Sequence, residues 1–419
     1  MGEKLVVVGQ GYVGLPLAMR AVEAGFDVVG IDVDSWRVKR LNAAESYVED
    51  ISDDQLAEAL RSGRYLASDG YADAEAFEIC LITVPTPLCD GAPDLRHIAA
   101  AGRSIAPLVR PGATVILEST TYPGTTQEFL LPLLEEGSGL RAPADFHLGY
   151  SPERIDPGNG RWRLENTPKV VSGIDRPSLE RIQAFYERLV QQVVPVSSLQ
   201  AAELCKLLEN TFRHVNIALV NELSIFAHQL GIDVWEAIDA AATKPFGYMR
   251  FTPGPGVGGH CLPIDPSYLS WAVKRGLGHN FRFVELANDI NNSMPDQVVQ
   301  RLTAALNERA KPVRGSRLLL LGLAYKKNVG DCRESPAIQI ARSLCKLGAH
   351  VRAADPHIDD YQLTSGIEIV EVTRQELASA DAVAILTDHD HFDYDLVEQV
   401  SPLVFDTRNR CHGTNVERL

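Results

Sequence analysis

Three glycines within the first 14 residues constrain the fold of this chain more than any other feature. Gly9, Gly11 and Gly14 follow an apolar run, LVVV, and precede a helical pattern that ends at Gly25. This G-x-G-x-x-G spacing permits a tight turn after a strand, close approach of a phosphate to bare backbone, and close packing of a helix on that strand. It therefore predicts a Rossmann-type βαβ unit; the alternative is a glycine turn in another kind of βαβ protein.

An acidic residue closes the second apolar run, VVGID (28–32). Asp32 stands about where a carboxylate binds the ribose hydroxyls of a dinucleotide. Because a carboxylate repels a 2′-phosphate, Asp32 favours NAD over NADP, although Arg37 is close enough in sequence to weaken that preference. We therefore expect NAD to be held by Gly9, Gly11, Tyr12, Val13, Gly14 and Asp32.

Short β-branched runs alternate with helical patterns in both outer parts of the chain. Strands are expected at 5–9, 28–32, 79–84, 114–119 and 193–196, and again at 317–325, 350–356, 381–388 and 402–409. Such alternation predicts mostly parallel, buried sheets. Between them, apolar residues at spacings of three and four from 198 predict one long helix, and the Gly/Pro-rich stretch 251–266 predicts a loop.

The expected fold class is therefore α/β. We expect two Rossmann-like, doubly wound domains joined by a long central helix and a helical middle domain. The boundaries are placed at 1–197 for the NAD-binding domain, 198–310 for the middle domain and 311–419 for the second Rossmann-like domain. The outer domains have similar layouts, but no sequence repeat indicates duplication.

Composition excludes several classes of function. The net charge of −15, with no block of Lys or Arg, argues against nucleic acid as a partner. No apolar run reaches the length of a membrane span and no leader pattern precedes the first strand, so we expect a cytoplasmic protein without a membrane partner. The seven cysteines are scattered, without zinc-ligand spacing, so neither a metal site nor a disulfide framework is expected.

One cysteine has a distinctive setting. Cys261 ends the stretch PGPGVGGHC, where bare backbone approaches the site, and a thiolate there can add to a carbonyl. A lone loop cysteine is more often inert. Lys206 and Asn210 lie four apart on the expected long helix and share a face. Leu204, Leu207 and Leu208 indicate that the neighbouring faces are partly buried, which argues against the alternative of a solvated lysine.

From Gly9 to about Asn409 the chain resembles the UDP-glucose/GDP-mannose dehydrogenase family. The motifs that carry the resemblance are VVGQGYVGLPLA, TVPTPL, ESTTYPGTT, SPERIDPGN, ELCKLLENTFR, PGPGVGGHCLPIDP, GLAYKKNVGDCRESPA and DTRN. SPERIDPGN and ATKPFGYM are most similar to the branch that acts on UDP-N-acetylglucosamine. The resemblance implies oxidation of C6 of a nucleotide-linked hexose, UDP-N-acetylglucosamine or UDP-glucose, to a carboxylate with two NAD.

The resemblance also implies catalytic roles. Cys261 adds to the aldehyde left by the first oxidation, and the thiohemiacetal is oxidised to a thioester that water hydrolyses. Lys206 stabilises the developing alkoxide, while Asn210 and Asp265 hold the water or substrate oxygens.

Two further catalytic roles come from the loops before the long helix. Thr120 is expected to position a water. Glu153 is the candidate general base for hydrolysis; its alternative is an ordinary ion pair with Arg154.

Binding roles follow from the same resemblance. Beyond the glycine motif, the cofactor residues are Thr86, Thr120 and Arg333. The substrate residues are Glu153, Arg154, Lys206, Asn210, Arg250, Gly258, Tyr325, Lys326 and Arg408. The cations near 326–333 suit a diphosphate, and the alternative for them is a solvated loop.

The long helix at 198–230 carries more apolar surface than one domain is expected to cover, so we expect a homodimer or a higher homo-oligomer. Two other functions stay open: a two-electron hydroxy-acid dehydrogenase and a non-catalytic NAD-sensing protein. Counting NADH per substrate separates them, because only the nucleotide-sugar reaction yields two.

Overall fold

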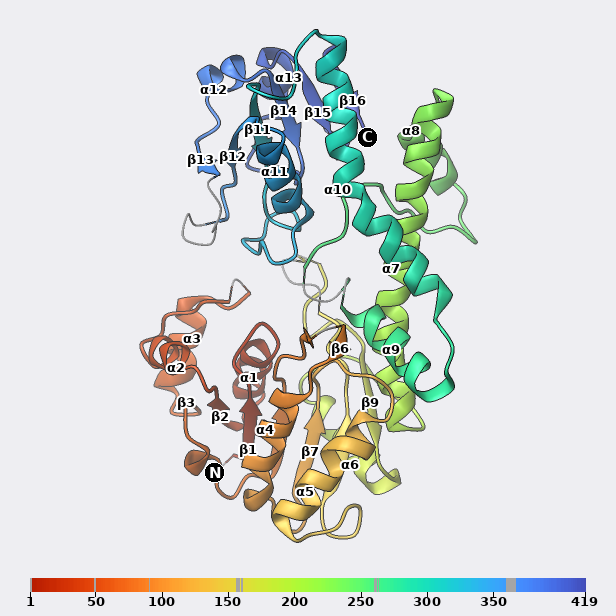
Figure 1. Cartoon of the computed structure of the whole chain (residues 1–419). Helices are drawn as coiled ribbons and strands as arrows, with labels where there is room; N and C mark the ends of the chain where they lie inside the picture. Colours follow the sequence, from red (N-terminus) through yellow and green to blue (C-terminus); the bar gives the residue numbers. More distant parts are fainter. Residues whose placement is uncertain are drawn as a thin grey trace. The chain divides into compact units, whose positions relative to one another are not determined.

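The computed structural model describes residues 2–48, 50–89, 91–155, 159, 161–259, 262, 264–358 and 367–419. It divides into two compact units, most of whose helices and strands are labelled in Figure 1. The first contains the chain up to Glu209 and Ser267–Leu277, and the second contains Asn210–Pro266 and Gly278–Leu419.

The first unit is built on an eight-stranded sheet. Across the sheet the strands are β10 (Val193–Pro195), β9 (Lys169–Gly173), β8 (His147–Tyr150), β7 (Thr114–Leu117), β4 (Ile79–Ile82), β1 (Lys4–Val8), β2 (Asp27–Ile31) and β3 (Tyr65–Ser68). Every neighbouring pair is parallel except β8 and β9. The five strands expected in this part are confirmed, and β3, β8 and β9 are additions. A short hairpin pairs β5 (Leu88–Cys89) with β6 (Ala92–Pro93).

Helices cover both faces of this sheet. Leu5 and Val7 of β1 belong to one apolar cluster, whereas Val6 and Val8 belong to another. The first cluster includes side chains of α1 (Gly14–Glu23), α3 (Asp53–Arg61) and α6 (Arg176–Tyr186), and the second includes α4 (Arg96–Ile105) and α5 (Leu131–Ser138). Because alternate side chains of a strand face opposite sides, burial of both faces explains the unbroken apolar runs. This unit also contains α2 (Ser35–Asn42), two short 3-10 helices (Tyr71–Ala74 and Ala106–Leu108) and a π-helix (Thr125–Leu130).

The second unit contains a six-stranded, wholly parallel sheet. Its order is β13 (Glu368–Ile369), β12 (His350–Ala354), β11 (Arg317–Leu321), β14 (Ala382–Ile385), β15 (Val404–Asp406) and β16 (Val416–Arg418). Leu318 and Leu320 face one apolar cluster, and Leu319 and Leu321 face the other. The helices are α8 (Val234–Ala242), α10 (Arg282–Glu308), α11 (Pro336–Lys346), α12 (Arg374–Ser379) and α13 (Tyr394–Val400). Two doubly wound sheets confirm the expected fold class.

Two helices begin in one unit and end in the other: α7 (Leu199–Leu230) and α9 (Asp265–Leu277). α7 is the long helix that the sequence predicts. Among the described residues, no helix combines the length and the apolar character that crossing a membrane requires.

α7 buries polar side chains and exposes apolar ones. Its exposed side chains include Leu204, Leu208, Phe212, Leu219, Leu223, Phe226 and Leu230. Its buried polar side chains are Glu203, Lys206, Thr211, His214, Asn221 and Ser224. The expectation that Leu204 and Leu208 mark buried faces beside Lys206 is wrong, because they are 42% and 61% exposed; only Leu207 is buried.

A buried ion cluster joins three segments of the first unit. The Lys169 ammonium, at the start of β9, lies 2.6 Å from a Glu118 oxygen and 3.0 Å from a Glu153 oxygen. The Tyr186 hydroxyl of α6 donates to the other Glu118 oxygen. Burial raises the pKa of Glu118, although the Lys169 charge opposes this rise. One cation is thus shared by two buried carboxylates, so its removal leaves both carboxylates buried without a counter-charge.

We predict that Lys169→Met lowers the free energy of unfolding by about 3–5 kcal/mol near neutral pH, because two buried carboxylates lose their cation. Without that cation both carboxyls have raised pKa values, so they bind protons as the pH falls and the deficit shrinks in acid. Urea unfolding at several pH values measures both effects.

Arg176→Met is the matched control, since it removes an exposed ion pair with Glu180 at 2.8 Å and should change stability little. Equal losses in the two variants would contradict the importance of the buried cluster.

Candidate active site

The three glycines of the turn after β1 have different roles. Two are required by the fold, and one leaves space for a ligand. Gly9 has a φ of +96°, and a Cβ added there would lie 2.8 Å from the Thr83 carbonyl oxygen. A Cβ on Gly14 would lie 1.8 Å from the Gly9 carbonyl oxygen, which excludes any side chain. A Cβ on Gly11 would meet no atom within 4 Å. Gly9 and Gly14 are therefore needed for the turn and helix packing, and Gly11 leaves bare backbone facing open space, as a dinucleotide phosphate requires.

Asp32 lies at the carboxyl end of β2 and faces this turn. Its buried carboxylate accepts hydrogen bonds from the backbone N–H groups of Gln10 and Asp34, both at 2.9 Å. Arg37 approaches the same carboxylate at 3.4 Å. The expected acid is thus fixed beside the turn, and the proximity of Arg37 inferred from sequence is also seen.

The other expected cofactor residues of this unit lie on neighbouring loops. Tyr12 is exposed in the glycine turn, and Val13 is partly buried beside it. Thr86 is buried after β4, and its carbonyl oxygen accepts the Tyr268 hydroxyl. Thr120 is partly exposed after β7, which is the strand next to β4. The loops after adjacent parallel strands meet at one edge of a sheet, which is where doubly wound folds bind ligands.

Sequence reasoning missed Glu203, which organises the loop after Thr120. Its buried carboxylate accepts the backbone N–H groups of Gly124 at 2.6 Å and of Thr126 at 2.8 Å, and the Thr126 hydroxyl at 2.6 Å. Burial raises the pKa of Glu203, while the hydrogen bonds from Thr126 and Gly124 oppose the rise. The sequence offered one signal for Glu203: it lies three residues before Lys206 on the same helix, and this spacing places the two side chains on one face.

Lys206 and Glu153 are brought together through the main chain. The buried Lys206 ammonium donates to the Glu153 carbonyl oxygen at 2.6 Å. The Glu153 carboxylate accepts the backbone N–H groups of Arg154 and Ile155, each at 2.7 Å, and the Lys169 ammonium at 3.0 Å. Burial by itself raises the pKa of Glu153, but the Lys169 charge and these hydrogen bonds hold it below its ordinary value. Glu153 is therefore a carboxylate with a fixed orientation.

The alternative role for Glu153, an ion pair with the Arg154 side chain, is not seen between these two described residues. The Arg154 guanidinium pairs with Glu209 at 2.7 Å and donates to the Pro168 carbonyl oxygen at 2.6 Å. Lys169, which pairs with Glu153, was not singled out from the sequence. The two residues are 16 apart and come together only through the sheet.

In the second unit, Asn210 and Asp265 are in contact. The Asn210 side-chain N–H group donates to the Asp265 carboxylate at 2.5 Å, and Asp265 is buried. The two residues expected to hold oxygens in the reaction are thus joined. Cys261 lies outside the residues that the structure describes.

The loop before Cys261 lies against Tyr325. A Cβ on Gly258 would lie 2.9 Å from the Tyr325 Cβ, and one on Gly259 would lie 2.7 Å from the Tyr325 ring. The Gly259 N–H donates to the Arg333 carbonyl oxygen at 3.1 Å. The glycines of GVGG therefore permit close packing on the loop that follows β11.

The expected cations of this unit differ in their environment. Lys326 is partly buried in the loop after β11. The Arg333 side chain pairs with Asp331 at 2.6 Å and is 55% exposed. Arg250 is also exposed and pairs with Asp239 at 2.6 Å. These ion pairs must open or be shared if Arg333 and Arg250 bind a ligand.

Arg408, like Lys326, is partly buried. Its Nε–H donates to the Leu386 carbonyl oxygen at 2.8 Å, and burial lowers its pKa. A Cβ on Gly254 would lie 2.8 Å from an Arg408 guanidinium nitrogen. Gly254 therefore gives Arg408 room at the start of the loop that leads to Cys261.

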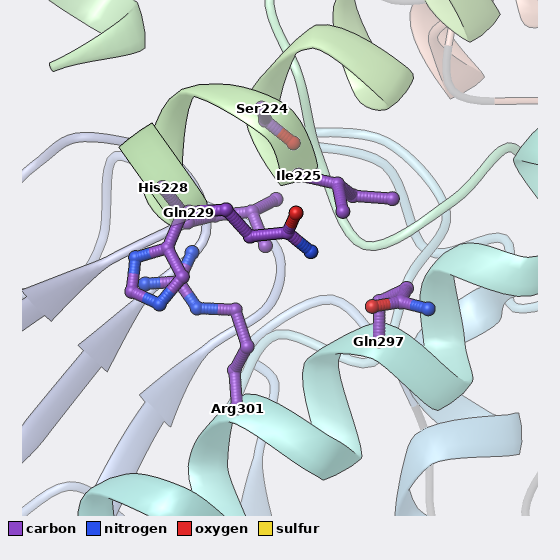
Figure 2. Close-up of a pocket in the computed structure, with 7 residues that line it drawn as sticks. Ser224, Ile225, His228, Gln229, Gln297 and Arg301 are labelled. Carbon is purple, nitrogen blue, oxygen red and sulfur yellow. The ribbon is translucent and has the colours of Figure 1, made fainter. Parts of the chain in front are cut away.

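A cavity of about 120 Å³ lies between α7 and α10 (Figure 2). It is lined by Ser224, Ile225, His228, Gln229, Gln297, Arg301 and Leu419, none of which is an expected site residue. Arg301 is neutralised by Glu417 at 3.0 Å. The cavity is too small for a nucleotide, because pockets for such ligands measure about 300–1,000 Å³.

Comparison with known families identifies all three parts of the chain. The UDP-glucose/GDP-mannose dehydrogenase family matches with its NAD binding domain over residues 3–190, its central domain over 200–293 and its UDP binding domain over 319–413. The NAD binding domain includes the glycine turn and Asp32, which confirms NAD as the cofactor.

Curated relatives match over nearly the whole chain. A UDP-N-acetyl-D-mannosamine dehydrogenase of Pyrococcus horikoshii is 36% identical over 93% of this chain and 90% of its own length. A UDP-N-acetyl-D-glucosamine 6-dehydrogenase of Pseudomonas aeruginosa is 35% identical over 93% of this chain and 91% of its own. Overall identity thus does not separate these substrates.

Solved structures agree. The UDP-D-ManNAc dehydrogenase of Pyrococcus horikoshii superposes with a TM-score of 0.90 at 33% identity, covering 99% of this chain and 98% of that one. A UDP-glucose dehydrogenase from Pyrobaculum islandicum gives a TM-score of 0.88 at 27% identity, covering 100% of this chain and 97% of that one. The chain belongs to the UDP-glucose/GDP-mannose dehydrogenase family of NAD-dependent oxidoreductases.

Proposed function

We propose that this enzyme oxidises the C6 hydroxyl of a UDP-linked hexose to a carboxylate in two steps, through a thioester on Cys261. The observation that carries the proposal is the buried Lys206 ammonium, which donates to the Glu153 carbonyl oxygen at 2.6 Å. A lysine is seldom buried without a functional or structural reason. Here it lies within a helical turn of Asn210, whose partner Asp265 is close in sequence to Cys261.

NAD held at Gly9, Gly11, Tyr12, Val13, Gly14 and Asp32, with Thr86, Thr120 and Arg333, supplies the hydride acceptor for both oxidations. In each oxidation the carbon loses a hydride and the oxygen loses a proton. Lys206 stabilises the negative charge that develops on that oxygen, and Asn210 and Asp265 hold the oxygen or a water.

Cys261 forms a bond to C6 of the aldehyde, and the thiohemiacetal loses the second hydride to give a thioester. Water then attacks the thioester, the C–S bond breaks, and the thiol is regenerated with the uronate. Glu153 accepts the proton of that water. The Lys169 charge and its hydrogen bonds hold its pKa below the ordinary value, so Glu153 is ionised near neutral pH and can accept a proton. Thr120 positions the water.

We assign UDP-N-acetylglucosamine as the first substrate to test. SPERIDPGN and ATKPFGYM support it, and the curated relatives named above act on UDP-N-acetylhexosamines. UDP-glucose is the alternative, since a structural relative carries that name. The nucleotide sugar is held by Glu153, Arg154, Lys206, Asn210, Arg250, Gly258, Tyr325, Lys326 and Arg408.

The working form is a homodimer or larger homo-oligomer in which the exposed apolar side of α7 is covered. Exposed apolar side chains follow α7 from Leu204 to Leu230, and large exposed apolar patches on soluble proteins mark interaction sites. A second copy of the chain supplies a matching surface by symmetry. Arg250, or Lys244 nearby in sequence, is the residue we assign to reach the substrate of the neighbouring subunit.

The paired variants Gly11→Ala and Gly14→Ala test the cofactor site. Gly11→Ala has room for its methyl group, so it should fold normally but bind NAD at least about 10-fold more weakly, because the methyl group stands where phosphate approaches the backbone. Gly14→Ala should lose stability as well as NAD binding. Calorimetric titration measures NAD affinity, and thermal unfolding measures stability. Unchanged NAD affinity in Gly11→Ala would show that the NAD phosphate does not bind at the Gly11 backbone.

Stoichiometry and trapping test the chemistry. The wild type should release two NADH per UDP-N-acetylglucosamine consumed, Cys261→Ser should stop before the acid, and Glu153→Gln should accumulate a covalent thioester visible in the intact mass. Yield of one NADH per substrate supports a two-electron hydroxy-acid dehydrogenase instead. Full conversion to acid by Cys261→Ser would refute the covalent scheme.

Leu219→Asp tests the assembly. Leu219 is 52% exposed on α7, and a charge there should dissociate the oligomer in light scattering because a carboxylate is costly to bury. Leu347→Asp, at a leucine 45% exposed after α11, is the control and should leave the mass unchanged. A wild-type monomer with full activity rules out the assembly.

A further inference from the structure

The turn after β11 in the second unit repeats the turn after β1. Gly322 has a φ of +82°, and its N–H donates to the Ala354 carbonyl oxygen at 2.9 Å. Gly9 has a φ of +96°, and its N–H donates to the Ile31 carbonyl oxygen at 2.7 Å. An acid follows the second strand in each case, Asp355 in one and Asp32 in the other.

The two acids bind their turns in the same way. Asp355 accepts the backbone N–H groups of Leu323 at 2.7 Å and Ala324 at 2.9 Å with one oxygen, and that of His357 at 2.9 Å with the other. Asp32 accepts from Gln10 and Asp34 in the corresponding arrangement. The second turn thus retains the framework of a dinucleotide site.

The acids differ in what else they contact. Asp32 pairs with the partly exposed Arg37, whereas Asp355 pairs with His389, whose Nε2 lies 3.0 Å from it. Both side chains of the Asp355–His389 pair are fully buried. The face of Asp355 that corresponds to a ribose-binding position is therefore occupied by imidazole.

The bonds of His389 determine its protonation. Its Nδ1 lies 2.9 Å from the backbone N of Asn328, and this N–H can only donate. Nδ1 must therefore be unprotonated, so the ring is neutral and its Nε2–H donates to Asp355.

The bond from Asn328 supports an uncommon backbone conformation. Asn328 has a φ of +57°, in the left-handed region. Its side-chain amide donates to Asp390 at 2.7 Å and accepts the Asp390 N–H at 3.0 Å. Such conformations persist where surrounding bonds over-determine them. His389 thus helps to fix the middle of the loop between β11 and α11.

This loop carries expected substrate residues. Ala324 accepts the Thr387 hydroxyl at 2.6 Å, and the Tyr325 N–H donates to the Asp331 carbonyl oxygen at 3.0 Å. Lys326 lies between these points and Asn328, and Tyr325 packs on Gly258 and Gly259. A shift at Asn328 therefore changes the placement of Lys326.

We propose that His389 is a positioning residue for nucleotide-sugar binding: as a neutral imidazole it joins Asp355 to Asn328 and so fixes the loop that presents Tyr325 and Lys326. The assignment rests on the proposed function in one respect, that this loop binds the nucleotide sugar. Protonation of Nδ1 places two N–H groups against each other and breaks the bond to Asn328. Binding should therefore weaken as the pH falls.

Several charged or polar groups surround His389. Asp355 bonds to its Nε2, and the His357 ring lies 4.8 Å from its ring. The Tyr394 hydroxyl donates to its carbonyl oxygen. Asp390 follows in sequence and pairs with Lys327 at 2.6 Å. Hydrogen bonds from Lys327 and Asn328 lower the pKa of Asp390. Burial raises the pKa of Asp355, and hydrogen bonds from His389 and from the backbone N–H groups of Ala324 and His357 oppose the rise.

The experiment measures UDP affinity of the full-length protein by calorimetry between about pH 8 and pH 5.5, where an imidazole titrates. Wild-type affinity should fall several-fold across this range. His389→Ala should bind UDP about 10-fold more weakly at high pH, the usual effect of losing buried hydrogen bonds. His389→Gln, which keeps a donor or acceptor but does not titrate, should give intermediate affinity and a flatter pH profile.

The controls separate the outcomes. His350→Gln, at an exposed histidine of β12, should retain the wild-type profile. His357→Gln should retain the wild-type fall as well, which assigns the titration to His389. NAD affinity should be unchanged in every variant. Retained NAD affinity shows that the first unit of the variant is folded.

If the wild type does not bind UDP, the proposed function fails and this assignment fails with it. If the wild type binds UDP and His389→Ala has the same affinity and pH profile, only the positioning role is wrong. The positioning role of His389 is also wrong if the pH profile of UDP affinity is flattened in His357→Gln but retained in His389→Gln.

Discussion

A buried carboxylate at the end of the second strand fixes the turn after the first strand in both sheets. Asp32 and Asp355 each accept backbone N–H groups from two segments, and hydrogen bonds from N–H groups to a carboxylate are among the stronger ones in proteins. The glycine turn and the first helix of each sheet take their positions from this interaction. Every residue that we assign to cofactor or nucleotide sugar in these turns depends on it.

The two turns share this framework but differ in the side chain that lies beside the carboxylate, and this difference gives them different roles. Arg37 beside Asp32 is partly exposed, so the carboxylate remains near solvent at the turn. His389 beside Asp355 is fully buried and occupies that position. The first turn can therefore accept a dinucleotide, whereas the second has become an internal support for a loop rich in cations. Likeness of fold alone does not reveal this difference, because it depends on single side chains.

Local patterns in the sequence predicted the central strands of both sheets, the glycine turn, the place of Asp32 and the length of α7, but not strands such as β3, β8 and β9. The predicted features depend on neighbours in the chain. The partners of Glu153 and Lys206 were not predictable in this way, because Glu153 bonds to Lys169, 16 residues away, and Lys206 bonds to the Glu153 carbonyl oxygen, 53 residues away, and both contacts form only in the fold. The buried face of α7 was misread for a related reason: spacing shows that a helix has an apolar side but does not show which side the rest of the chain covers. The covered side of α7 carries polar as well as apolar side chains, and this places Glu203, Lys206 and Asn221 in hydrogen-bonded surroundings.

The ion cluster of Glu118, Lys169 and Glu153 also limits how this sequence can change. Two acids share one cation, so loss of Lys169 leaves two buried negative charges, whereas loss of one acid leaves a charge-balanced pair of Lys169 and the other acid. Lys169 is therefore the member of the cluster that cannot be lost by itself, and sequences that keep both acids should keep the lysine.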